Sequence, residues 1–421
     1  MEHYYSDYSS EGEYWEGEAT TPDSILLSMV QAYDWNGTLA RIAKFPDECK
    51  AVGVQGRTPL HVACDHDAPA VVIQALMKAY PEASLLVGTS KMNPLHITCS
   101  SQHASEEVVR VLLESSGLGK QMSSMCDVDG DTPLHAACRC GAPIEVLKLL
   151  LQANPDVVNK RDYEGLTPLL RLWVRYFVIL GDNVIDAVKG PADLRGELGE
   201  AWKKTELLLC CAHLGSLGPD PKTLRKFRTM HAASAVDCPR PVVKVATIVY
   251  RHQLLERDED GLTPLLIAAN TPVYKVRDLS DGGYMLEDRI HGDDETYEEM
   301  AYEEDADTSQ PSVIDILMEA APAAAGIPDP RGRLALHLAI RSGKRWHQGV
   351  CAILNGRPDA LSHEDVANGL VPFLQASVVP RPDCGTIFEL LRRDPALLLH
   401  WTAHRINIQS NLDEDGDVQM Q

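Results

Sequence analysis

A nine-residue block recurs along most of the chain and constrains its fold more than any other feature. The most complete copy runs from Gly130 to Cys138 and reads G-D-T-P-L-H-A-A-C. Gly130 can adopt a positive φ and suits a tight turn. Thr132 can cap a helix through its hydroxyl, and Pro133 fits the first helical position. The block therefore predicts a turn followed by a short helix.

A second, longer helix is predicted after this block. The break at Gly141-Ala142-Pro143 is followed by apolar residues at helical spacing over 144–152. This pattern stops before Pro155, and proline ends helices. The unit is therefore a turn, a short helix, a longer helix and an exit loop.

Copies of the block recur at a regular interval. Those at 56–64 and 93–99 are nearly complete, with Asn93 in place of the threonine, and those at 165–170 and 261–266 have leucine in place of the histidine. Weaker copies bring the histidine-equivalent positions to 61, 96, 135, 170, 231, 266, 337 and 374. Most steps between these positions are 35–39 residues, and the two longer steps predict insertions.

The block resembles the ankyrin repeat, whose mark is T-P-L-H-x-A-A in a unit of about 33 residues. The resemblance covers roughly residues 50–395 and implies an all-α ankyrin-repeat solenoid of about eight helix-turn-helix repeats with short hairpin-like turns. The expected organisation is an acidic disordered tail at 1–22, an N-terminal helical cap at 23–52, the repeat array at 53–395 with insertions at about 173–198 and 273–310, and a C-terminal acidic tail at 396–421.

Helical periodicity places most of the helices outside the blocks. The cap is expected to contain helices Ile25–Tyr33 and Thr38–Lys44, and the short helix after Thr167 is expected to run on through Leu180. The second helices are predicted at 71–79, 106–114, 144–152, 201–214, 242–250, 311–320 and 387–392.

The acidic charge is concentrated in three segments. The formal net charge is −22, and residues 278–307 alone carry thirteen acidic side chains and one basic side chain. Residues 1–20 and 401–421 are also acidic, so the remainder is nearly neutral. Nucleic-acid binding needs a concentrated basic surface, and the sequence therefore predicts no nucleic-acid partner.

Cysteine usage indicates a reducing compartment. The eleven cysteines include no C-x-x-C pair, and Cys64, Cys99 and Cys138 occupy the same position of the block, which predicts packed small residues. The N-terminus does not resemble a signal peptide, and no apolar run is long enough for a membrane helix. We therefore expect a cytoplasmic or nuclear protein with no membrane association.

No motif in the chain indicates catalysis or a cofactor. His61, His96 and His135 each precede a cysteine by three residues, but one pair per repeat makes a column rather than a four-ligand zinc site. In ankyrin repeats, by resemblance, this histidine holds the threonine and the turn through hydrogen bonds. Phosphate-binding, dinucleotide and hydrolase motifs are absent from the sequence. We therefore expect no metal, no cofactor and no enzymatic activity.

The resemblance implies a protein–protein interaction scaffold that binds its partner at the turn tips and on the concave face, with the chain a monomer. Tyr163 is the strongest candidate, because exposed aromatic side chains often dominate binding energy. The candidate residues by position are Gln55, Arg57, Lys91, Met92, Asp129, Asp131, Tyr163, Glu164, Glu259, Arg331 and Arg333.

Three alternatives remain open at this point, and one of them is a purely structural array with no specific partner. The chain could be a regulatory subunit or an enzyme with a site at the repeat-four insertion, where Arg171, Arg175, Asp182, Asp186 and Lys189 occur. The acidic insertion 278–307 could be a solvated loop, or it could recruit a basic partner.

Overall fold

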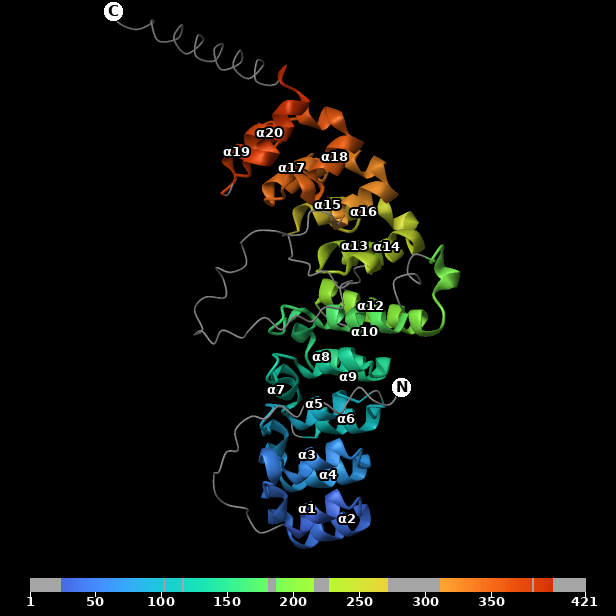
Figure 1. Cartoon of the computed structure of the whole chain (residues 1–421), viewed down its shortest axis with the longest axis vertical. Helices are drawn as coiled ribbons and strands as arrows, with labels where there is room; N and C mark the ends of the chain where they lie inside the picture. The colour runs from blue at the N-terminus through green and yellow to red at the C-terminus, as the bar shows by residue number, and fades with distance from the viewer. Residues whose placement is uncertain are drawn as a thin grey trace, which may run out of the picture. The chain divides into compact units, whose positions relative to one another are not determined.

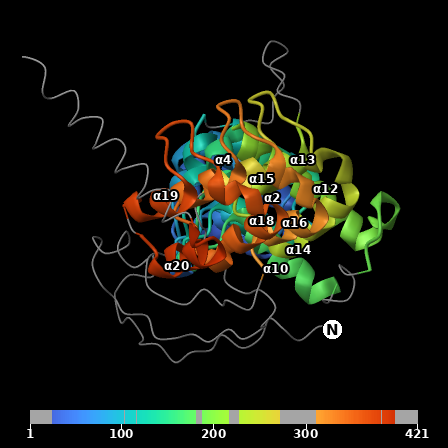
Figure 2. The same ribbon diagram turned by 90° about the horizontal axis from the view of Figure 1, so that it is seen from above.

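The structure is a computed structural model that describes residues 24–101, 103–115, 117–180, 187–215, 227–271, 311–380 and 382–396. The chain divides into two compact units, Met1–Cys99 with Ala104–Val128 and Ser100–His103 with Asp129–Gln421. We call them the N-terminal and C-terminal units and describe each by itself. The described secondary structure in both is helical (Figures 1 and 2).

The N-terminal unit is built of helix pairs. Within it, α1 packs against α2, α3 against α4 and α5 against α6, while α1, α3 and α5 form one row and α2, α4 and α6 another (Figure 1). The helices are α1 (Ile25–Gln31), α2 (Trp35–Lys44), α3 (Pro59–Asp65), α4 (Ala70–Ala79), α5 (Pro94–Cys99), α6 (Glu106–Glu114) and α7 (Gly119–Ser124).

The C-terminal unit continues the same pairing. Its first helices contact one another in the order α13, α15, α17 and α19, and its second helices in the order α14, α16 and α18. The helices are α8 (Pro133–Cys140), α9 (Ile144–Ala153), α10 (Pro168–Leu180), α12 (Gly196–Leu214), α13 (Thr229–Ala235), α14 (Arg240–Val249), α15 (Pro264–Asn270), α16 (Val313–Ala320), α17 (Ala335–Arg341), α18 (Cys351–Gly356), α19 (Pro372–Val378) and α20 (Cys384–Arg393).

The core of each unit is formed by the apolar face of every helix. The leucine that follows the block's proline is buried in the copies that have it, as at Leu60, Leu95, Leu134 and Leu265. Burying such a side chain stabilises a fold by roughly 1.5–3 kcal/mol. The cysteine at the end of the block is buried as well, which confirms that Cys64, Cys99 and Cys138 are packed small residues.

Proline ends the second helices. Five of them are followed directly by a short 3-10 turn that begins with proline, at Pro46, Pro81, Pro155, Pro322 and Pro358. Proline lacks the N–H that the next helical hydrogen bond needs, so the chain leaves the α-helix at that point. The prediction that Pro155 stops a helix is therefore confirmed.

Several predicted helices differ from the structure at their ends. Helix α6 has the predicted bounds, and α10 runs on to Leu180 as expected. Helix α1 ends at Gln31 rather than Tyr33, because Tyr33 adopts a left-handed φ of 58°. Helix α12 begins at Gly196 rather than at residue 201, and its added turn buries Leu198.

Two further differences occur in the short helices. Helix α20 begins at Cys384, three residues before its predicted start, because the side chain of Asp383 accepts a hydrogen bond from the Thr386 N–H and caps it. Helix α7 was not predicted. The expectations for residues 1–22, for 273–310, for Asp182 and Asp186, and for most of 396–421 lie outside the described residues.

Candidate functional site

An aspartate carboxylate holds each of three turns from within. Asp162 Oδ1 accepts hydrogen bonds from the N–H groups of Glu164 and Leu166, both at 2.9 Å. Asp258 and Asp329 accept the equivalent pairs at 2.7–3.0 Å. A buried carboxylate needs hydrogen-bond donors of this kind. Because both donors are backbone N–H groups of the same turn, one aspartate side chain fixes the backbone of that turn. The turns are therefore rigid supports for the side chains at their tips.

In several blocks, a residue with positive φ lies two positions before the residue that caps the first helix. Gly130, Gly165 and Gly261 have φ values of 79°, 79° and 76°, which confirms the role predicted for Gly130. In the N-terminal unit Lys91 occupies the same position with φ 54°. This conformation is strained for a residue with a Cβ atom.

Successive turns contact one another within each unit. In the C-terminal unit the Tyr163 N–H donates to the carbonyl oxygen of Asp129 at 3.0 Å. The Tyr163 ring lies against Gly130, where an added Cβ would be 2.8 Å from the ring Cδ1. Pro330 meets Gly261 and Val366 meets Gly332 in the same way. The tip of one turn therefore packs on the glycine of the turn before it.

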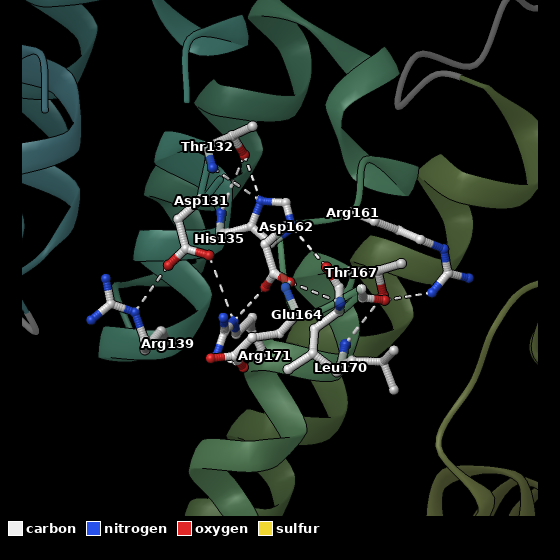
Figure 3. A network of polar contacts seen from close by, with 12 residues as sticks. Asp131, Thr132, His135, Arg139, Arg161, Asp162, Glu164, Thr167, Leu170 and Arg171 are labelled. Carbon is white, nitrogen blue, oxygen red and sulfur yellow. Dashed lines mark hydrogen bonds and ion pairs between the residues drawn. The ribbon is translucent and has the colours of Figure 1, made fainter. Parts of the chain in front are cut away.

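The block histidine ties its own turn to the next segment of chain (Figure 3). His135 Nδ1 lies 2.8 Å from the Thr132 hydroxyl and accepts from the Thr132 backbone N–H, while Nε2 lies 3.2 Å from the Leu166 carbonyl oxygen. His61 makes the same contacts with Thr58 and Leu86. This arrangement requires a neutral ring that donates from Nε2, and it confirms the hydrogen-bonding role implied by the resemblance.

Burial keeps these histidines neutral. Desolvation lowers the pKa of His61 and of His135 to about 4, although nearby backbone carbonyls act in the opposite direction. The pKa of His231 and of His337 is lowered for the same reason. The four rings are therefore structural donors and acceptors rather than proton carriers near neutral pH.

A buried arginine links the turn of Tyr163 to the neighbouring turn (Figure 3). Arg171, on α10, lies with Nε 2.6 Å from Asp162 Oδ2 and with Nη1 3.1 Å from Glu164 Oε2. Its Nε is also 3.6 Å from Asp131, which is paired in turn with Arg139 at 3.2 Å. The guanidinium therefore connects the turn of Asp131 to the turn of Asp162 through ion pairs.

This structural role of Arg171 was not predicted from the sequence. One signal for it was available, because the equivalent positions in α3 and α8 are the small apolar residues Val62 and Ala136. An arginine on a helix face that is otherwise apolar and buried needs carboxylate partners. The partners could not be identified from the sequence alone.

The candidate partner-binding residues fall into three groups. Exposed residues are Gln55, Lys91, Asp129, Tyr163, Glu164, Glu259 and Arg331. Arg57 and Met92 are half-buried. Asp131 and Arg333 are only 2% and 7% exposed, and Arg333 is paired with Asp329 at 2.7 Å. Their interactions within the protein leave little surface for a partner, so we withdraw both from the candidate set.

Several of the exposed charges are engaged by neighbours. Glu164 pairs with Arg171, and Glu259 pairs with Arg228 at 3.0 Å. The ring of Tyr163, by contrast, is 68% exposed although its backbone is fixed. Exposed aromatic side chains often dominate binding energy, so Tyr163 remains the first candidate among these residues.

Within the described residues, no group of three or more His, Cys, Asp or Glu side chains is arranged to hold a metal ion. His61 and Cys64 are both buried in the core. Burial raises the pKa of the Cys64 thiol to about 12, so the thiolate that a metal needs is disfavoured. In the same part of the chain, none of the helices combines the length and the apolar character needed to cross a bilayer.

Comparison with known proteins agrees with the geometry of the turn and the two helices. The family model described as Ankyrin repeat matches residues 129–163, which include the turn of Gly130, helices α8 and α9 and the start of the next turn. A search of curated proteins found no match for the chain. The match at residues 129–163 therefore supports an ankyrin-repeat family for this chain.

Proposed function

We propose that the chain is a non-enzymatic scaffold that binds a protein partner through its turn tips and the first helices beside them. Ankyrin repeats are in general protein–protein interaction modules, and this supports the proposal. We call the exposed candidates of each unit its tip surface: Gln55 and Lys91 in the N-terminal unit, and Asp129, Tyr163, Glu164, Glu259 and Arg331 in the C-terminal unit. We further propose an array of about eight repeats over residues 53–395, with an N-terminal helical cap at 23–52.

The observation that carries the proposal is the position of Tyr163. Its ring is exposed, yet its backbone is held by Asp129 and its turn by Asp162 and Arg171. A side chain that is already ordered loses little conformational entropy when a partner binds. Large aromatic side chains of this kind dominate the energetics of protein interfaces.

The ion pairs of Arg171 favour the scaffold function over the alternative of an enzyme with a site at the repeat-four insertion. Arg171 is buried and engaged with Asp162 and Glu164, so its charge stabilises the protein itself. Catalytic sites instead combine convergent polar groups with a pocket that admits a ligand. We therefore propose that Arg171 and the turn that it fixes serve the tip surface.

The test is quantitative affinity capture from native cells with the wild-type chain, Tyr163→Ala and Val71→Ala. Val71 lies on α4 and is exposed, so its substitution controls for the loss of an exposed apolar side chain. We expect a set of proteins recovered with wild type and Val71→Ala to fall at least about tenfold with Tyr163→Ala, since truncating a hot-spot residue costs about 2 kcal/mol or more. Equal recovery with all three would remove Tyr163 from the proposed surface.

Lys91→Ala serves as the corresponding variant of the N-terminal unit. Loss of the same proteins with Lys91→Ala would place both units in one interaction. Loss with Tyr163→Ala alone would limit the interaction to the C-terminal unit. If neither variant changes recovery while the unfolding midpoints stay equal to wild type, the tip surface is not the binding site.

A further inference from the structure

Three aromatic rings from neighbouring helix pairs gather in the N-terminal unit. Tyr33 lies in the loop between α1 and α2, Trp35 begins α2, and His66 follows the end of α3. The Tyr33 and His66 rings are stacked, with centroids 4.6 Å apart and planes at 13°. The Tyr33 and Trp35 rings are 5.8 Å apart and at 74°. We call these three residues the aromatic cluster.

The geometry gives Tyr33 one covered face and a nearly perpendicular neighbour. The stacked His66 ring covers one face of Tyr33, and the Trp35 ring lies at a steep angle to the Tyr33 ring. Tyr33 remains 59% exposed. Two exposed aromatic rings at a steep angle can turn their negative faces toward one cation, and alkylammonium groups are bound by such pairs of faces.

The backbone at Tyr33 is strained in favour of this arrangement. Tyr33 has φ 58°, a conformation that asparagine or glycine adopts far more readily than a bulky aromatic residue. Two hydrogen bonds hold it, from the Tyr33 N–H to the Val30 carbonyl oxygen at 3.1 Å and from the Trp35 N–H to the Tyr33 carbonyl oxygen at 3.0 Å. Apart from its stacking on His66, the exposed Tyr33 ring adds little to the core.

The charges beside the cluster are negative. Asp34 lies between the two ring-bearing residues and is exposed, with its carboxylate accepting from the Gly37 N–H. Asp67 follows His66 and is exposed too. Asp65 is already paired with Arg57 at 2.9 Å. Asp34 and Asp67 therefore favour a cation over a neutral or anionic ligand.

We propose that the aromatic cluster binds an alkylammonium cation in the corner between Tyr33 and Trp35. The cation could be the lysine or methylated-lysine side chain of a protein, or a free quaternary ammonium compound. His66 acts as a positioning residue through its stacking on Tyr33. The cluster is at the end of α3 opposite the turn that carries Gln55, so this site is separate from the tip surface and stands without it.

The first experiment follows the tryptophan indole N–H signals of the full chain by NMR while tetramethylammonium chloride is added. Sodium chloride at matched ionic strength is the control, and the Trp35→Phe variant assigns the Trp35 signal. We expect a saturable shift of the Trp35 signal with a Kd on the order of millimolar, because two aromatic contacts give weak binding. A Trp35 shift no larger than that caused by sodium chloride would overturn the proposal.

Three variants separate binding from folding. Tyr33→Asn suits the left-handed backbone and removes the ring, so it should keep the unfolding midpoint while weakening binding at least about fivefold. Tyr33→Phe keeps the ring face and should bind within about twofold of wild type. Asp34→Asn keeps a good helix cap but removes the charge, and it should weaken binding. Unchanged binding by Tyr33→Asn would contradict the proposal.

The source of the cation is decided by a second comparison. Capped trimethyllysine and capped lysine amides are titrated beside tetramethylammonium. Tighter binding of trimethyllysine than of tetramethylammonium assigns the site to a modified side chain of a partner protein. Equal binding of the two assigns it to a free small cation. Tightest binding of unmodified lysine assigns it to ordinary basic partners.

Discussion

Arg171 Nε lies 2.6 Å from Asp162 Oδ2. Arg171 occupies a position of α10 at which α3 and α8 carry small apolar residues. The pair connects the body of α10 to the turn that displays Tyr163. Asp162 is at the same time the acceptor for two N–H groups of that turn. One ion pair therefore couples the packing of a helix to the geometry of the proposed binding surface.

Removing Arg171 should destabilise the C-terminal unit strongly. Arg171→Met leaves the buried carboxylates of Asp162 and Asp131 without their shared cation, and breaking such a pair costs about 3–5 kcal/mol. Arg139→Met removes a more exposed partner of Asp131 and should cost about 1 kcal/mol or less. Chemical unfolding, with hydrogen exchange over 127–180, measures both. Equal effects of the two variants would contradict this ranking.

Gly130 and Gly165 offer a matched test of turn packing. Both have φ 79°, so alanine at either position adopts a left-handed conformation at roughly 1–2 kcal/mol. At Gly130 the new Cβ also meets the ring and the backbone nitrogen of Tyr163 at 2.8 Å, whereas at Gly165 it meets no described atom within 4 Å. Gly130→Ala should therefore be the more destabilising by about 1–3 kcal/mol. The difference in unfolding free energy between the two variants is the measurement.

Lys91 should be replaceable by glycine with a gain in stability. Lys91 has φ 54° at the position that glycine holds in other turns, and glycine relieves strain of up to about 1 kcal/mol. Lys91→Ala removes the same side chain but keeps the strain, so it is the control for lost lysine contacts. Thermal unfolding should rank Lys91→Gly above both wild type and Lys91→Ala. A midpoint for Lys91→Gly below that of Lys91→Ala would refute the role of strain.

Acid should destabilise the protein through its block histidines. The folded pKa of His61 and of His135 is about 4, below the unfolded value near 6.5, so the unfolded chain binds more protons between these values. The stability contributed by the neutral rings is complete above pH 6.5. It decreases toward pH 4 by up to about 1.4 kcal/mol per pH unit for each histidine.

The control for the pH dependence is a variant with leucine at both positions. Leucine occupies the equivalent places 170 and 266 in this chain, so His61→Leu/His135→Leu keeps a side chain that the block accepts. Denaturant unfolding between pH 7 and pH 4.5 should show a shallower slope for this variant than for wild type. An unchanged slope would mean that other groups cause the acid sensitivity.

Much of the local structure could be predicted because its causes lie within a few residues. Gly130, Thr132 and His135 act on one turn and the first turn of one helix, and their types alone indicate those roles. The first residues of α12 and α20 were harder to predict, because they depend on which side chains become buried and which residue caps the helix. The left-handed Tyr33 was missed because tyrosine gives no local signal for positive φ.

By itself, the sequence determined the recurring turn, the paired helices and the interior position of the block leucines and cysteines, because these follow from backbone sterics and hydrophobic periodicity. The tertiary structure alone decided which charges were buried. Asp131 was expected at the surface and is enclosed beside Arg171, 40 positions away in the sequence. It also decided that Tyr33, Trp35 and His66 meet. Contacts between distant residues depend on how helices pack, and no local pattern encodes that packing.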